Sequence, residues 1–126
     1  MTRAKSTKPG PSRLEPVVWS LFAAGGTVAA LLLPVHVAIL GIAFAAGWLP
    51  DHALSYERVL DLVRHPVTKV YLGVLTALPL YHAAHRLRFV IHHQLGLHGG
   101  RRPVAAACYG TALAGTALTA VVLAHI

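Results

Sequence analysis

The sequence predicts an all-α membrane protein with three transmembrane helices, on two observations. The chain is unusually apolar, since 56% of its 126 residues are hydrophobic and its mean hydropathy is +0.61. The apolar residues are also gathered into three segments, each long enough to supply the roughly 20 residues that cross a bilayer. The predicted spans cover about residues 17–49, 67–91 and 104–126.

The first 14 residues are basic and contain proline, and we expect them to form a disordered cytoplasmic tail. They do not open a typical secretory signal, because the apolar run that follows is roughly twice as long as a signal-peptide core. Residues 15–126 are therefore expected to form one three-helix anchor domain.

The first span has no formal charge between Val17 and Leu49. Pro34 lies near its middle, where a missing backbone N–H predicts a kink. Trp19 and Trp48 lie near its two ends, where indole rings anchor a helix at the headgroup level.

The loop after the first span contains a helical pattern. Apolar residues recur there at the spacing of one helix face: Tyr56, Val59, Leu60 and Val63. With Ser55 as a candidate N-cap and Pro66 as a stop, this predicts a short amphipathic helix over Tyr56–Arg64 on the outer surface.

The net charge of +7 comes from basic residues that flank the spans. This placement argues against a nucleic-acid-binding protein, which would gather them on one soluble face. Basic residues are densest before the first span and around the second loop, at Arg3, Lys5, Lys8, Arg13, Arg86, Arg88, Arg101 and Arg102. By the positive-inside rule, the N-terminus is cytoplasmic and the C-terminus is outside.

The third span is rich in small residues that let membrane helices approach closely. They recur at every fourth position, as Ala107, Thr111, Gly115 and Thr119, and Gly25 and Gly26 begin similar pairs in the first span. The single cysteine, Cys108, excludes an intrachain disulfide and argues against a zinc or iron–sulfur site within this chain. We expect it to be a small packing residue.

The cytoplasmic end of the second span carries the candidate site. His82, His85 and Phe89 fall on one helix face, and Arg86 follows His85. The predicted topology puts Trp19 at the same leaflet. A quinone carbonyl needs hydrogen-bond donors, and histidine or arginine can also exchange its protons. We therefore predict a quinone-binding pocket, with no catalytic residue and no metal ligand in this chain. Its candidate residues are Trp19, His85 and Arg86.

Other roles stay open for these polar residues. Arg86 and Arg88 can act as anchors that extend to the interface. His36, in the middle of the first span, can bond across the bundle, line a cavity or ligate iron, and we favour a structural role. A haem held by His36 with His82 or His85 is the competing chemistry.

Three motifs in this order resemble the D subunit, a membrane anchor, of bacterial fumarate reductase: EPVVWSLFAAGG at 15–26, DHALSYERVL at 51–60 and LPLYHAAHRLR at 78–88. The resemblance implies that Trp19 corresponds to the family tryptophan near the proximal quinone, and His85 and Arg86 to its His-Arg pair. His82, Arg88 and Phe89 inherit no role from it.

The resemblance also implies partners and location. This chain would pair with a second membrane anchor, the C subunit, in the bacterial cytoplasmic membrane as a multi-pass protein. Together they would hold a flavoprotein subunit with covalent FAD and an iron–sulfur subunit, and menaquinol would be oxidised nearby for fumarate reduction. No cofactor is expected to be bound by this chain alone, and menaquinone would be shared with the partners.

Two other functions remain as alternatives. One is a haem-containing succinate dehydrogenase anchor, which a haem spectrum would reveal. The other is a non-redox membrane scaffold or transporter component. A proton-coupled transporter is less favoured, because no acidic residue lies inside a predicted span.

Overall fold

The computed structural model describes residues 15–94, 96 and 101–126, so the predicted tail at residues 1–14 lies outside the described residues. All regular structure in the described part is helical. In chain order, the elements are α1 (Glu15–His36), the π-helix η1 (Val37–Ala43), α2 (Tyr56–Arg64), α3 (Pro66–Gln94) and α4 (Arg101–His125).

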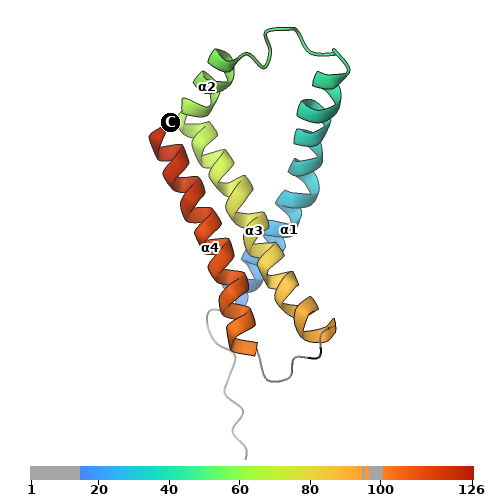
Figure 1. Ribbon diagram of the computed structural model, residues 1–126, viewed down its shortest axis with the longest axis vertical. Helices are drawn as coiled ribbons and strands as arrows, with labels where there is room; N and C mark the ends of the chain where they lie inside the picture. The colour runs from blue at the N-terminus through green and yellow to red at the C-terminus, as the bar shows by residue number, and fades with distance from the viewer. Residues whose placement is uncertain (1–14, 95, 97–100) are drawn as a thin grey trace, which may run out of the picture.

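Helix α3 occupies the centre of the molecule, packed against α1 on one side and α4 on the other (Figure 1). The start of α1 lies at the same end as the last turns of α3 and the first turns of α4. Helix α2 and the C-terminus lie at the opposite end. There, the Arg64 side chain donates a hydrogen bond from Nε to the backbone oxygen of Ile126 at 3.3 Å.

Two helical segments in the described part of the chain are long and apolar enough to cross a membrane, Pro16–Ala43 and Arg102–His125. In the first segment, no residue of the most apolar stretch is buried inside the protein. In the second segment, 11% of the residues in the corresponding stretch are buried. A core helix of a soluble protein would be mostly buried. Their apolar side chains therefore face outward, as in a membrane helix.

Helix α3, the second predicted span, is not one of these two segments. At 29 residues it is long enough, but its histidines and its cations at Lys69, Arg86 and Arg88 lower its mean hydropathy. The same residues make it the most polar of the long helices. Its role as a span stays a prediction.

The helix of the first predicted span ends before residue 49. Gly47 adopts a left-handed conformation with φ 69°. Its N–H donates to Phe44 O at 3.1 Å, and the Trp48 N–H donates to Ala43 O at 2.9 Å. These two bonds form a Schellman motif, which closes a helix with glycine just past its last turn. The apolar composition continues past Gly47, but the helix ends there.

Pro34 lies inside α1 without ending it. Three residues later the hydrogen-bonding pattern changes, and η1 runs from Val37 to Ala43 as a π-helix. Proline removes the backbone bond to Ala30 in the preceding turn, whereas η1 begins in the turn that follows Pro34.

Helix α2 has the predicted bounds. Ser55 precedes it in an extended conformation, with φ −60° and ψ 148°, although its side chain makes no capping hydrogen bond. At the other end His65 is extended, with ψ 130°, because the residue before a proline, here Pro66, disfavours the helical region. The predicted location of α2 on the outer surface is not tested by these contacts.

The small buried core lies between α3 and α4. It consists of Ala84, Cys108 and Ala112, each less than a tenth exposed. Cys108 is therefore the small packing residue that the sequence predicts. Gly115 lies against Leu80, since a Cβ added to that glycine would be 3.0 Å from the leucine Cδ1.

Candidate functional site

Helices α1 and α3 are in close contact at Gly25 and Gly26. A Cβ added to Gly25 would overlap the Leu78 carbonyl oxygen and lie 2.9 Å from His82 Cβ. A Cβ added to Gly26 would lie 2.7 Å from His82 Cε1. At this crossing His82 donates from Nδ1 to the Phe22 carbonyl oxygen at 2.8 Å. The two glycines thus allow a histidine of α3 to reach the backbone of α1.

An aromatic cluster continues from this crossing toward the start of α1. The Phe22 ring stacks on His82, with centroids 4.3 Å apart and planes at 10°, and its centroid is 4.8 Å from that of His85. Trp19 meets Phe22 edge-on at 5.8 Å and His85 at 5.9 Å. Because Phe22 touches all three rings, it holds Trp19 beside His85.

His85 is the one buried polar or charged residue in the described part of the chain, at 7% exposure. Its Nδ1 is 2.7 Å from the hydroxyl oxygen of Tyr109 on α4. Its Nε2 is also buried, but has no hydrogen-bond partner among the described residues. Leaving a buried polar atom unpaired costs roughly 1–3 kcal/mol. Such an atom is therefore a candidate for binding a ligand.

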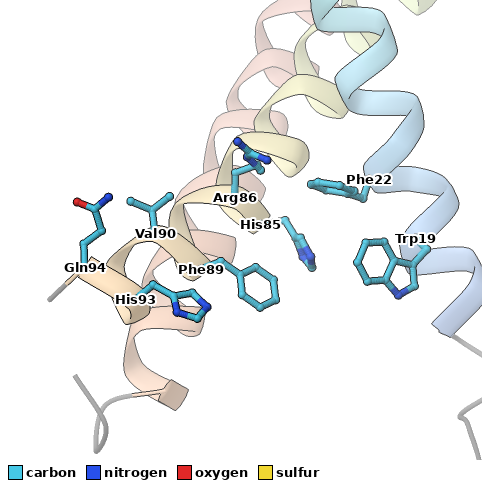
Figure 2. Close-up of a pocket in the computed structure, with 8 residues that line it drawn as sticks. All are labelled: Trp19, Phe22, His85, Arg86, Phe89, Val90, His93 and Gln94. Atoms are coloured by element: carbon cyan, nitrogen blue, oxygen red, sulfur yellow. The ribbon is translucent and has the colours of Figure 1, made fainter. Parts of the chain in front are cut away.

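Beside His85 lies an open groove of about 430 Å³ between α1 and α3 (Figure 2). This volume falls in the range of small-molecule sites. Figure 2 shows the imidazole directed between the Trp19 and Phe89 rings. The groove is lined by Trp19, Phe22, His85, Arg86, Phe89, Val90, His93 and Gln94.

The structure brings all three predicted site residues to this one groove. Trp19 comes from α1, while His85 and Arg86 come from adjacent positions of α3. They differ in setting: His85 is buried, whereas Trp19 is 55% exposed and Arg86 is also exposed. Figure 2 shows the side chains of His85 and Arg86 leaving α3 in different directions.

Two residues that matter here were not predicted from the sequence. Phe22 is one apolar residue among many in α1, and no local signal distinguishes it. Tyr109 is the only phenol in a segment of small and aliphatic residues. That contrast could have indicated that Tyr109 is a polar partner for a histidine of the second span. It could not have indicated which histidine.

His36 has the structural role that we favoured. Its Nδ1 donates to the Leu32 carbonyl oxygen at 2.7 Å, because a carbonyl can only accept. The neutral ring then has a lone pair on Nε2, and this nitrogen accepts from the Tyr71 hydroxyl of α3 at 3.2 Å. Both ring nitrogens therefore have partners within the chain.

We expect Tyr71→Phe to lower the free energy of unfolding by about 0.6 kcal/mol, the average for a side-chain hydrogen bond between membrane helices. The measurement is denaturation of the purified protein in detergent. Tyr56→Phe is the matched control, because Tyr56 is 76% exposed. Equal stability of the two variants would contradict a stabilising role for the His36–Tyr71 bond.

Comparisons with known proteins agree with these features. A family model that describes the D subunit of fumarate reductase matches residues 11–124. The fumarate reductase D subunit of Mycobacterium tuberculosis (strain H37Rv) is 49% identical over 105 residues, which cover 82% of this chain and 81% of the relative.

Relatives from two other organisms carry the same name. The protein of Photobacterium profundum is 43% identical over 104 residues, covering 82% of this chain and 85% of the relative. The protein of Vibrio cholerae is 42% identical over 109 residues, covering 85% of this chain and 81% of the relative. With a family match over nearly its whole length, the chain belongs to the family of fumarate reductase D subunits.

Proposed function

We propose that this chain is a hydrophobic membrane-anchor subunit of a bacterial fumarate reductase, and that its groove forms part of the site where menaquinol is oxidised. The observation that carries the second part is the unpartnered Nε2 of His85 beside an apolar groove. A quinol has the matching chemistry, because its ring and tail are apolar and its two oxygens form hydrogen bonds.

The proposed topology has three spans, with α3 as the second. Its polar residues are tolerated there because α3 has a helix on either side. Of the eleven Lys and Arg residues in the sequence, eight precede the first span or lie around the loop between α3 and α4, and the other three, Arg58, Arg64 and Lys69, lie in α2 and at the start of α3. By the positive-inside rule, which counts Lys and Arg alone, the groove end is cytoplasmic.

In that proposed orientation, the groove would lie where an iron–sulfur subunit and a flavoprotein subunit dock, with the C subunit as the second anchor. Oxidation of one quinol releases two electrons and two protons, and reduction of one fumarate to succinate consumes two of each. Electrons would leave toward the iron–sulfur clusters of the partner, and flavin chemistry would occur in the flavoprotein. This chain contributes binding and proton exchange.

Within the groove the residues divide these tasks. Trp19 and Phe89 supply apolar walls for the quinol ring, and the indole N–H is a further donor. His85 accepts a hydrogen bond or a proton from a quinol oxygen at Nε2. Arg86, an exposed residue of the lining, provides positive charge that stabilises negative charge on an oxygen.

The haem alternative fits the chain poorly. A clamp of His36 with His82 or His85 would require His36 to give up its bond to Leu32 or to Tyr71. His36 also contacts α3 at Tyr71, 11 positions before His82, and at about 1.5 Å of rise per residue the two histidines lie at different levels of the helix. We therefore derive no step through a haem.

The test is purification of this chain with its partners from the native membrane in mild detergent. We expect covalent flavin, no haem spectrum, and fumarate reduction driven by menaquinol. A preparation with haem bound in the anchor would support the succinate dehydrogenase alternative. An intact preparation without flavin would overturn the anchor assignment.

A further inference from the structure

Tyr109 reaches His85 from a different helix, and this contact has a chemical consequence. The two atoms, Tyr109 Oη and His85 Nδ1, are 2.7 Å apart, a short hydrogen bond between neutral groups. In a neutral imidazole one nitrogen is protonated and the other is not, and the partner of one nitrogen sets the state of the other. Tyr109 therefore controls what His85 presents to the groove.

We propose that Tyr109 is a positioning residue for quinol oxidation: its hydroxyl oxygen accepts the Nδ1–H of His85, so that Nε2, buried beside the groove, is left as a bare proton acceptor. This inference rests on the proposed function of the groove. It adds a residue of α4, the helix that contributes no side chain to the groove lining.

The unpartnered state of Nε2 favours this direction of the bond. Buried N–H groups without a partner are rare in proteins, whereas under-satisfied acceptors are less so. With no partner for Nε2 among the described residues, a lone pair there avoids a buried N–H without an acceptor, while the hydroxyl proton of Tyr109 belongs to a residue that is only half-buried. His82 follows the same pattern, since its Nδ1 must be the donor toward the Phe22 carbonyl.

The Tyr109 ring is held firmly enough for such a role. Its centroid is 5.8 Å from that of Tyr81, in a stacked arrangement. The Arg88 guanidinium lies 5.6 Å from the Tyr109 centroid and 4.7 Å from that of Phe89. A cation over an aromatic face is an attractive contact. The hydroxyl is thus fixed in direction by contacts with α3 on more than one side.

The proton then has a defined route. Nε2 accepts one of the two protons of the quinol, while Nδ1–H keeps its bond to Tyr109, which stabilises the positive ring that forms. That proton leaves to the solvent through the open groove before the second proton follows by the same nitrogen. The two electrons leave to the iron–sulfur partner, so atoms and charge balance.

The spectroscopic test uses the whole complex with ¹⁵N-labelled histidine, and reads the tautomer of His85 from its two nitrogen shifts, assigned by their loss in His85→Leu. We expect the Nδ1–H form in the wild type and a shift toward the Nε2–H form in Tyr109→Phe. An Nε2–H ring in the wild type, or a tautomer that Tyr109→Phe leaves unchanged, would overturn the proposal. A merely structural role for Tyr109 would not move this signal.

The kinetic test compares Tyr109→Phe with Tyr81→Phe, which removes a neighbouring hydroxyl that makes no hydrogen bond within the described residues. We expect Tyr109→Phe to lower kcat for menaquinol oxidation by about tenfold, the effect of one lost hydrogen bond to a charging group. Activity with a soluble one-electron donor that bypasses the quinol should not change. Tyr81→Phe should retain wild-type turnover, and an equal loss in both variants would contradict a specific role for Tyr109.

The double variant Tyr109→Phe/His85→Leu separates the two levels of failure. If Tyr109 acts through His85, the double variant should be no slower than His85→Leu alone. If His85→Leu turns over quinol normally, the proposed site itself is wrong. If His85→Leu is impaired while Tyr109→Phe is not, only the positioning role is overturned.

Discussion

Replacement of His85 by leucine is expected to lower menaquinol-dependent fumarate reduction by about a hundredfold, the lower bound for loss of a general acid–base group. Leucine fills a similar volume beside Phe22 and Phe89, so the aromatic cluster should persist. It offers no acceptor for a quinol proton and leaves the Tyr109 hydroxyl without its partner. The measurement is steady-state turnover with menaquinol, beside turnover with a soluble donor that bypasses the quinol.

His125→Leu is the matched control for His85→Leu. It makes the same change of side chain on an exposed residue at the other end of the molecule, where Nδ1 bonds only to the Val121 carbonyl of its own helix. It should leave both activities at wild-type values. Loss of the purified complex in His85→Leu, rather than loss of quinol turnover, would show that His85 serves assembly instead of chemistry.

Replacement of Gly25 by alanine is expected to destabilise the protein by roughly 1–3 kcal/mol, the usual cost of an overpacked contact. In an unconstrained helix the same change is stabilising by up to about 1 kcal/mol. Here the new methyl group would overlap the Leu78 carbonyl, which is backbone and cannot rotate away. Helices α1 and α3 would have to separate. The measurement is thermal or denaturant-induced unfolding of the purified protein.

Two glycines in the same chain provide controls for Gly25→Ala. A Cβ at Gly41 would meet only Val37 Cγ1, at an ordinary 3.8 Å, and a Cβ at Gly73 would meet nothing within 4 Å. Both alanine variants should be as stable as the wild type or more so. If Gly25→Ala matched them, the close approach of α1 and α3 would not be a determinant of the fold.

Much of the architecture can be predicted from local sequence. The bounds of α2 follow from the spacing of Tyr56, Val59 and Val63, and from Pro66. The two most apolar helices follow from length and composition alone. These features depend on residues close together in the chain, whose spacing directly reflects helix geometry.

The groove is only partly predictable from the sequence. Trp19, His85 and Arg86 could be named because a histidine and an arginine are unusual in an apolar segment, and because the resemblance points to the same three. The contacts of Phe22 and Tyr109 depend on how α1, α3 and α4 cross. The end of the first helix could not be read from hydropathy for a different reason, because hydropathy does not register the left-handed turn at Gly47.

The π-helix η1 has a consequence for how this family can vary in length. Each π-helical turn holds one residue more than an α-helical turn, so η1 stores a spare residue in the first span. The packing of that span on α3 is carried by α1, which ends before η1 begins. Deletion of one residue between Val37 and Ala43 would convert the segment to ordinary α-helix and leave Gly25, Phe22 and Trp19 in register with α3. We therefore expect single-residue gaps among relatives to be tolerated in this stretch, and excluded between Trp19 and Gly26.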